Sequence, residues 1–179
     1  ADIVRRADPH TAIKRIRIKL GFNLKQGEDD FLNGIEYLMD VSEKFGLISA
    51  FYFVTSPGGP HDSVYDPDAL LLKNIIREIQ ARGHEIGFHP GFSTFLNVER
   101  LVFEKNRLTE ILGHSQFGGR QHLLMFRPPD TWRAWELAGL LYDSTLGFAD
   151  HEGFRAGTSF DYWPFDLELD RELNIIERP

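Results

Sequence analysis

The chain has 179 residues, with 27 acidic and 20 basic side chains and a formal net charge of −7. This length suffices for one hydrophobic core and is short for two, so we expect a single domain over residues 1–179. The negative charge argues against nucleic acid or an anionic membrane as a partner, because both would repel the protein. The absence of cysteine excludes disulfides and thiolate metal sites. No apolar run has membrane-spanning length and no signal peptide is visible, so a soluble, cytoplasmic protein is favoured, while the compartment is left open.

Residues 29–45 are predicted to form an amphipathic helix that ends at Gly46. Its apolar side chains recur at helical spacing and would share one face: Phe31, Ile35, Leu38, Val41 or Met39, and Phe45. Residues 48–54 form a Phe-rich apolar run typical of a buried strand, and the turn residues 57–60 end it. The segment 12–22 is left open between helix and strand, because its apolar spacing changes along its length.

Helices and strands alternate after this point. Asp66 and Pro67 are typical of a helix start, and Gly83 is typical of a helix end. The remaining predicted elements are a strand at 85–89, a helix from Asn97 to Gly113, a Gly-rich loop, a strand at 122–126, a helix from Asp130 or Thr131 to Gly139, a strand at 141–145, and one or two strands beyond Trp163. The alternation predicts right-handed βαβ units and therefore an α/β fold with a mostly parallel sheet.

Three ionisable residues are associated with the ends of successive predicted strands. His89 and Asp143 belong to the final residues of their strands, and Arg127 directly follows the strand between them. The carboxyl ends of parallel strands meet at one rim of a sheet, where ligands usually bind. An imidazole, a guanidinium and a carboxylate at one rim predict a polar functional site. The alternative interpretation is that each side chain satisfies backbone groups near the end of its own strand.

The motifs around these residues resemble those of a known family. Residues 83–89 (Gly-His-Glu-Ile-Gly-Phe-His), 126–129 (Phe-Arg-Pro-Pro) and 142–145 (Tyr-Asp-Ser-Thr), in this order and spacing, resemble the polysaccharide deacetylase superfamily, also called the NodB-homology domain. The resemblance spans about residues 29–150, and residues 143–150 together with 153–158 resemble an uncharacterised bacterial branch of that superfamily.

The resemblance implies a distorted (β/α) barrel of fewer than eight strands. It also implies a divalent metal, usually zinc, that serves to remove acetyl groups from N-acetylated sugars. In the family one aspartate and two histidines hold the metal and leave one position open for water and the substrate carbonyl. A second aspartate acts as the base, an arginine orients that base, and a histidine near the C-terminus acts as the acid.

Transferred to this chain, the resemblance makes His89 a metal ligand and makes Arg127 and Asp143 catalytic residues. His84 matches a position that is usually buried beneath the site. Ser93 stands where the second metal histidine is expected, and serine is a poor zinc ligand, so the usual ligand set is incomplete.

Two further elements of the family pattern are missing. Residues 28–30 (Glu-Asp-Asp) are the one candidate for the aspartate pair, but their position favours a helix start, where acidic residues offset the helix dipole. The terminal histidine motif is absent. The chain starts at Ala1 without methionine and stops at Pro179 directly after a strand-like run, so we expect a fragment truncated at both ends. Its barrel would then be incomplete and would not close; the other interpretation is a degenerate member of the family.

His122 and Arg120 follow two glycines at the start of the predicted strand at 122–126. Because the start of a parallel strand lies at the opposite rim from its end, we expect His122 to lie away from His89. A core or surface role for His122 is favoured over ligand binding.

Other side chains are candidates for substrate binding. His61 follows the Phe-rich strand and so belongs to the same rim as His89. Arg155 and His151 lie in the polar segment after Asp143 and could contact a sugar or carboxylate, or be solvated. Trp132, Trp135 and Trp163 could stack on a sugar, although Trp135 lies in an amphipathic helix where core packing is favoured.

Two classes of function follow. The first is a metal-dependent carbohydrate deacetylase, in which metal-bound water attacks an acetamide carbonyl. The second is a catalytically degenerate barrel that binds a glycan or an acidic metabolite, which the serine at position 93 favours. In both classes the partner is a carbohydrate or other small molecule. A dinucleotide enzyme is disfavoured, because no Gly-x-Gly-x-x-Gly motif follows a predicted strand.

Overall fold

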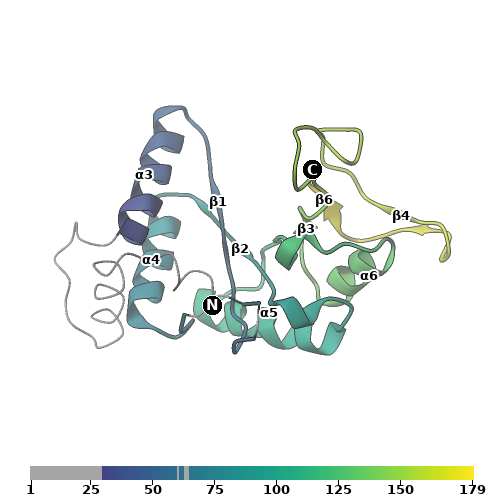
Figure 1. Cartoon of the computed structure of the whole chain (residues 1–179), viewed down its shortest axis with the longest axis horizontal. Helices are drawn as coiled ribbons and strands as arrows, with labels where there is room; N and C mark the ends of the chain where they lie inside the picture. Colours follow the sequence, from purple (N-terminus) through teal and green to yellow (C-terminus); the bar gives the residue numbers. More distant parts are fainter. Residues whose placement is uncertain (1–29, 60, 63–64) are drawn as a thin grey trace. The chain divides into compact units, whose positions relative to one another are not determined.

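The structure is a computed structural model that describes residues 30–59, 61–62 and 65–179 (Figure 1). The chain divides into two compact units, Ala1–Ser49 and Ala50–Pro179, and each is described by itself. None of the helices in these described residues is long and apolar enough to cross a membrane.

The first unit contains helix α3 (Asp30–Lys44), which confirms the helix predicted over 29–45. Its buried side chains lie four and three residues apart, at Ile35, Met39 and Ser42. Leu38 and Phe45 are exposed, so the apolar face expected from the sequence was wrong at those two positions. The buried stripe includes a serine because the Ser42 hydroxyl donates to the Leu38 carbonyl oxygen at 2.8 Å and so satisfies its own polar group.

Four short strands of the second unit run parallel. Strand β1 (Ala50–Phe53) pairs with β2 (Glu85–Phe88), and β3 (Tyr142–Asp143) pairs with β6 (Ile176–Glu177). Gly119 joins the two pairs, because it bridges Phe88 on one side and Asp143 on the other. The α/β class with parallel strands is therefore confirmed. The strands of the described region form no closed barrel (Figure 1).

The position of Gly119 in the sheet corrects the prediction of a strand at 122–126. Those residues begin instead with a 3₁₀ helix, η2 (His122–Leu124), and the segment read as a Gly-rich loop enters the sheet. A Cβ atom on Gly119 would lie 1.9 Å from the Phe88 carbonyl oxygen, and one on Gly118 would lie 2.3 Å from the Tyr142 ring. The backbone can approach its neighbours this closely because both positions lack a side chain.

Three helices accompany these strands in the second unit: α4 (Leu70–Ala81), α5 (Val98–Leu112) and α6 (Asp130–Leu137). One side of the sheet packs on α5 and α6, where Phe88 lies in a buried cluster with Leu108 and Trp135. The core position expected for Trp135 is thus confirmed.

The predicted start of α5 is confirmed, and the predicted start of α4 is wrong. The Asn97 side chain accepts a hydrogen bond from the Arg100 backbone N–H at 3.0 Å and caps α5 as expected. Helix α4 begins at Leu70 rather than at Asp66 and Pro67. The Asp66 carboxylate accepts from the Asp68 backbone N–H at 2.9 Å, which closes a turn ahead of the helix.

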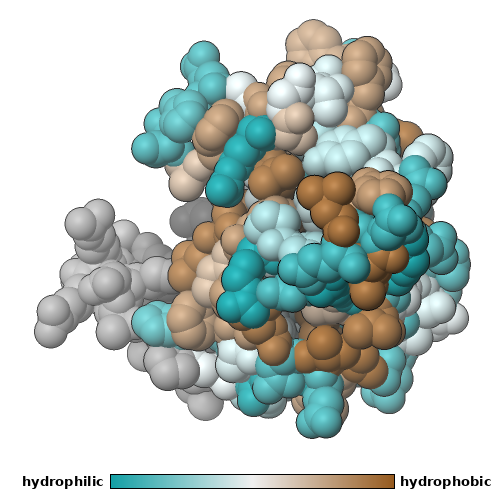
Figure 2. Space-filling model, turned by 90° about the vertical axis from the view of Figure 1, so that its right-hand side faces the viewer, coloured by the Kyte–Doolittle hydropathy of each residue, from teal (hydrophilic) through white to brown (hydrophobic). Residues whose placement is uncertain are grey.

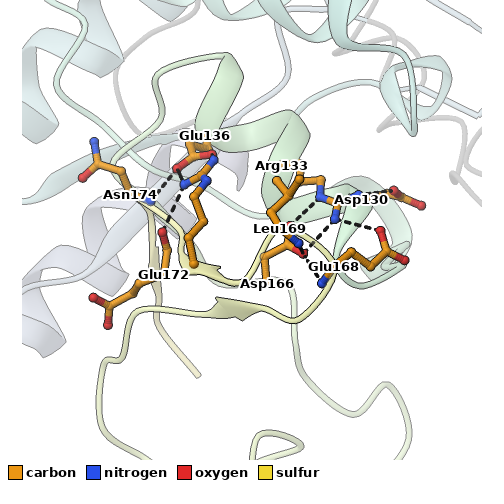
Figure 3. Close-up of polar contacts among 9 residues, drawn as sticks. Asp130, Arg133, Glu136, Asp166, Glu168, Leu169, Glu172 and Asn174 are labelled. Carbon is orange, nitrogen blue, oxygen red and sulfur yellow. Dashed lines mark hydrogen bonds and ion pairs between the residues drawn. The ribbon is translucent and has the colours of Figure 1, made fainter.

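Three ion pairs join a hairpin of β4 (Phe165–Asp166) and β5 (Arg171–Glu172) to α6: Arg133 pairs with Asp166 and Glu168, and Arg171 pairs with Glu136 (Figure 3). Arg133 donates from Nη2 to Oδ1 of Asp166 at 2.7 Å, and Arg171 donates from Nη2 to Oε2 of Glu136 at 2.6 Å. Hydrogen bonding from the Arg133 guanidinium lowers the pKa of Asp166 to about 2. The hairpin is therefore fixed by charged groups rather than by a large apolar contact.

The side chains around this hairpin are mostly exposed, and the large apolar ones are Phe160, Trp163, Phe165, Leu167 and Leu169. Figure 2, which looks onto this side of the unit, shows apolar patches between hydrophilic residues. Exposed apolar side chains are common on the surfaces of folded proteins.

Candidate functional site

A row of polar side chains crosses the sheet one residue beyond the paired strand ends. Phe88, Gly119, Asp143 and Glu177 are bridge partners of one another in that order. The next residue in each segment continues the ladder and faces the opposite side of the sheet, because side chains alternate along a strand. These four residues, His89, Arg120, Ser144 and Arg178, are called the polar row; their backbone N–H groups each donate to a carbonyl of the neighbouring strand at 2.8 to 2.9 Å.

His89 of the polar row faces a second histidine. Its Nε2 atom lies 3.1 Å from Nδ1 of His122, and the ring centroids are 5.1 Å apart. This pairing overturns the expectation that His122 lies at the opposite rim. The reason is the shift of the strand to Gly119, after which η2 places His122 beyond the strand end instead of at its start.

The outer nitrogen of each ring contacts a backbone carbonyl. His122 donates from Nε2 to the His61 carbonyl oxygen at 3.0 Å, and the His89 ring has a hydrogen bond with the Arg120 backbone. Because Nε2 of His89 faces His122, Nδ1 is the nitrogen free for that second bond. In the neutral rings each outer nitrogen then carries the hydrogen, and each inner nitrogen presents a lone pair to the other.

Two lone pairs at this separation repel unless a proton or a metal cation lies between them. Burial, followed by the neighbouring His122 charge, lowers the pKa of His89, which favours the neutral ring and its free lone pair. A cation bound by both inner nitrogens would relieve the repulsion.

The histidine pair fits two ligand positions of a zinc ion. Metal-bound imidazoles commonly donate their other N–H to a carbonyl, as both rings do here. Two nitrogen ligands of a tetrahedral zinc lie about 3.3 Å apart, close to the separation of this pair. Within the described ranges, no group of three or more His, Asp or Glu side chains could hold a metal ion. The described residues thus offer two nitrogens of the three protein ligands that a catalytic zinc normally has.

The loop after His89 is fixed by two buried carboxylates that the sequence reading did not single out. The Phe92 backbone N–H donates to Oδ1 of Asp62, and the Gly91 backbone N–H donates to Oε2 of Glu104, both at 2.7 Å. The second oxygen of Asp62 accepts from the Ser56 hydroxyl at 2.6 Å. Burial opposes ionisation of Asp62, but the bonds from Ser56 and Phe92 outweigh it, and the pKa of Asp62 is lowered. The sequence feature that could have identified Asp62 is its position directly after His61, in the loop that follows β1.

The remaining predicted site residues lie apart from the histidine pair. Arg127 is exposed and donates from Nε to Asp130 at 2.7 Å at the start of α6, so it does not end a strand as expected. Ser93 is exposed in the 3₁₀ helix η1 (Phe92–Thr94). Arg155 is exposed. His61 is exposed as well, and its ring centroid lies 4.5 Å from that of Phe92.

Asp143 lies on the other side of the sheet, where it is fully buried beside Glu177. Its Oδ1 atom accepts from the Thr145 backbone N–H at 3.0 Å, and its Oδ2 atom has no hydrogen-bond partner among the residues that the structure describes. Burial and the neighbouring Glu177 raise the pKa of Asp143. Trp132, a predicted sugar-stacking residue, donates its indole N–H to Oε2 of Glu177 at 2.7 Å. The structure therefore places Asp143 with Glu177 and Trp132, not with Arg127.

The chain has no match among family models, curated proteins or solved structures.

Proposed function

We propose that this protein is a divalent-metal-dependent hydrolase that removes acetyl groups from N-acetylated sugars or a polysaccharide. The supporting observation is that Nε2 of His89 lies 3.1 Å from Nδ1 of His122, while the other nitrogen of each ring is hydrogen-bonded to a backbone group. In this proposal His122 takes the ligand role that the sequence pattern assigns to position 93. The sheet of the second unit would be part of the distorted barrel.

A metal bound here would polarise the acetamide carbonyl and lower the pKa of a coordinated water. The chain's own residues prepare the position. The carbonyls of His61 and Arg120 fix both ring orientations, and the carboxylates of Asp62 and Glu104 fix the loop that follows His89. The nearby guanidinium of Arg120 helps to keep His89 neutral, as ligation requires.

The test combines metal binding with acetate release. Isothermal titration with Zn²⁺ and an assay of acetate release from N-acetylglucosamine oligomers would be run on the wild type, His89→Ala and His122→Ala. His151→Ala is the matched control, because His151 is exposed and bonds to Asp150 outside the polar row.

We expect one metal per chain in the wild type and in His151→Ala. In each site variant we expect at least a hundredfold weaker zinc binding and a comparable loss of acetate release. Zinc binding that survives both site substitutions would contradict the proposal. Sugar binding without acetate release, at saturating metal, would favour the degenerate binding barrel instead.

A further inference from the structure

We propose that Arg120 binds a carboxylate of the substrate, so that the preferred ligand is an anionic N-acetylated sugar. The inference rests on the proposed function, since it takes the N-acetylated group to lie at the histidine pair. It adds the chemical class of the substrate, which the histidines alone leave open.

Arg120 is the neighbour of His89 in the polar row, one strand away. Adjacent strands lie about 4.8 Å apart, so the two side chains start within reach of a single sugar ring. Strand alternation places both on the same side of the sheet. A group held by Arg120 would thus lie beside whatever occupies the position between the imidazoles.

The Arg120 side chain is held in place by Ser144 and Tyr52. Its Nε atom donates to the Ser144 carbonyl oxygen at 3.0 Å and to the Ser144 hydroxyl at 3.3 Å. The guanidinium carbon lies 5.6 Å from the centroid of the Tyr52 ring. These contacts use Nε and one face of the guanidinium, and they leave the two Nη atoms for the planar, bidentate binding that suits a carboxylate.

The charge of Arg120 is not paired within the described part of the chain, where no ion pair joins it to a carboxylate. Other arginines of the second unit have such partners: Arg133 pairs with Asp166, Arg171 with Glu136, and Arg178 with Asp161. Asp143 and Glu177 act on Arg120 electrostatically, but they face the opposite side of the sheet. An exposed, oriented cation in a protein of net charge −7 is a feature that favours an anionic ligand.

A cluster of hydroxyl groups lies next to Arg120. The Tyr52 hydroxyl lies 3.3 Å from the Tyr142 hydroxyl and 3.2 Å from the Ser144 hydroxyl. Both tyrosine rings lie across glycines, since a Cβ on Gly87 would come within 2.2 Å of the Tyr52 ring and one on Gly118 within 2.3 Å of the Tyr142 ring. Tyr142 and Ser144 are buried, and the Tyr142 hydroxyl donates to the Glu85 carboxylate, so the half-buried Tyr52 is the member of this group that a ligand beside Arg120 could reach.

The probes are N-acetylglucosaminuronate and N-acetylglucosamine, which differ by a carboxylate in place of a hydroxymethyl group. Their binding to the full chain would be measured by NMR titration after treatment with a chelator, so that no turnover occurs. The variants are Arg120→Gln and Arg120→Lys. Arg77→Gln is the charge-matched control, because Arg77 is exposed on α4 and bonds to Asn74.

We expect the wild type and Arg77→Gln to bind the uronate about tenfold more tightly than the neutral sugar, as a charged hydrogen-bond pair provides. Arg120→Gln should bind both sugars equally. Arg120→Lys keeps the positive charge but loses the two parallel N–H donors of the guanidinium, so its affinity for the uronate should fall several-fold. If Arg120→Gln fails to fold, the uronate affinity of Arg120→Lys tests the inference by itself.

Equal binding of both sugars by the wild type would overturn the inference, as would unchanged discrimination in the folded Arg120 variants. Acetate release plays no part in this measurement. A discriminating protein that never releases acetate would therefore contradict the proposed function and leave the Arg120 site intact. A protein that releases acetate but binds both sugars equally would support the proposed function and contradict the Arg120 inference.

Discussion

The Nε2 atom of His89 lies 3.1 Å from Nδ1 of His122, although the two residues are 33 positions apart in the chain. What brings them together is the entry of Gly119 into the sheet between β2 and β3. The histidine pair, the Arg120 side chain and the order of the strands all depend on that one glycine contact.

The first prediction is that Gly119→Ala severely destabilises the second unit. The new Cβ would lie 1.9 Å from the Phe88 carbonyl oxygen, and backbone cannot move aside as a flexible side chain can. We expect the free energy of unfolding to fall by about 3 kcal/mol or more, the range of strained or overpacked core substitutions. Urea denaturation followed by circular dichroism measures this.

Gly147→Ala is the control for that substitution. A Cβ at this position would meet its nearest atom, the Thr145 carbonyl oxygen, only at 4.0 Å. Its stability should stay within about 0.5 kcal/mol of the wild type. Similar losses in the two alanine variants would show that the close approach at Gly119 is not what stabilises the sheet.

The sequence predicts the elements whose stability is local. Strand β2 is an apolar run, and α5 carries both a capping Asn97 and a terminal Gly113 with a φ of +76°; both elements were found in the expected places. Helical spacing also located α3, although its buried face differs from the expected one at Leu38.

The strand at Gly119 could not be predicted in the same way. A glycine pair has no apolar alternation, and its suitability for the sheet depends on the Phe88 backbone and the Tyr142 ring, which are remote in sequence. The apolar residues 122–126 had the composition of a buried strand, but positive φ angles at Leu123 and Leu124 take them out of extended geometry. Because the strand was predicted at 122–126, His122 was expected at the wrong rim, and Arg127 instead of Arg120 was expected to be the arginine at the rim.

The second prediction concerns Asp62→Asn. Both carboxylate oxygens of Asp62 accept hydrogen bonds, from the Ser56 hydroxyl and the Phe92 backbone N–H. An amide keeps one acceptor for the Phe92 N–H and directs its NH2 group at the Ser56 oxygen, so the buried Ser56 hydroxyl proton loses its acceptor and the negative charge that strengthens both bonds is lost. We expect a loss of about 1–3 kcal/mol in the free energy of unfolding and weaker zinc binding, because the loop after His89 loses an anchor.

Asp150→Asn is the comparison, since Asp150 is exposed and its carboxylate bonds to the neighbouring His151 side chain. Chemical denaturation and zinc titration of the two variants give the answer. If Asp62→Asn is as stable as Asp150→Asn and binds zinc like the wild type, the anchoring role of Asp62 is wrong.

The third prediction is that the contribution of Glu177 to stability falls as pH rises from about 4.5 to about 7, whereas the lowered pKa of His89 acts in the opposite direction near the top of this window. Burial raises the pKa of Glu177 from 4.5 to about 7, and Asp143 lies beside it as its bridge partner. In this window the folded state holds a proton that the unfolded state has released, so raising the pH favours unfolding. The other charged or titratable groups near Glu177 are Arg120, Asp161 and Tyr162.

Glu177→Gln should flatten this pH dependence. The glutamine carbonyl can still accept the Trp132 indole N–H, and no charge develops as pH rises. Thermal unfolding at pH 5, 6, 7 and 8 would compare it with Glu172→Gln, which changes an exposed carboxylate. Parallel curves for the two variants would exclude Glu177 as the source of the slope.

The fourth prediction is that the hairpin of β4 and β5 depends on Asp166. Its side chain is fully buried and accepts from two nitrogens of Arg133 and from the backbone N–H groups of Glu168 and Leu169. Asp166→Ala removes all four bonds and leaves the Arg133 guanidinium without its main partner (Figure 3). We expect amide hydrogen exchange in residues 165–172 to accelerate at least tenfold, with little change in α5, because local opening of the hairpin becomes easier.

Glu168→Gln separates this effect from a general loss of charge on the hairpin. Glu168 also bonds to Arg133, at 2.8 Å, but its side chain is exposed and makes one contact where Asp166 makes four. Exposed ion pairs contribute little, so exchange in Glu168→Gln should match the wild type. Equal acceleration in both variants would mean that the net charge around Arg133 holds the hairpin. Acceleration in neither variant would mean that contacts other than the ion pairs of Arg133 with Asp166 and Glu168 hold the hairpin.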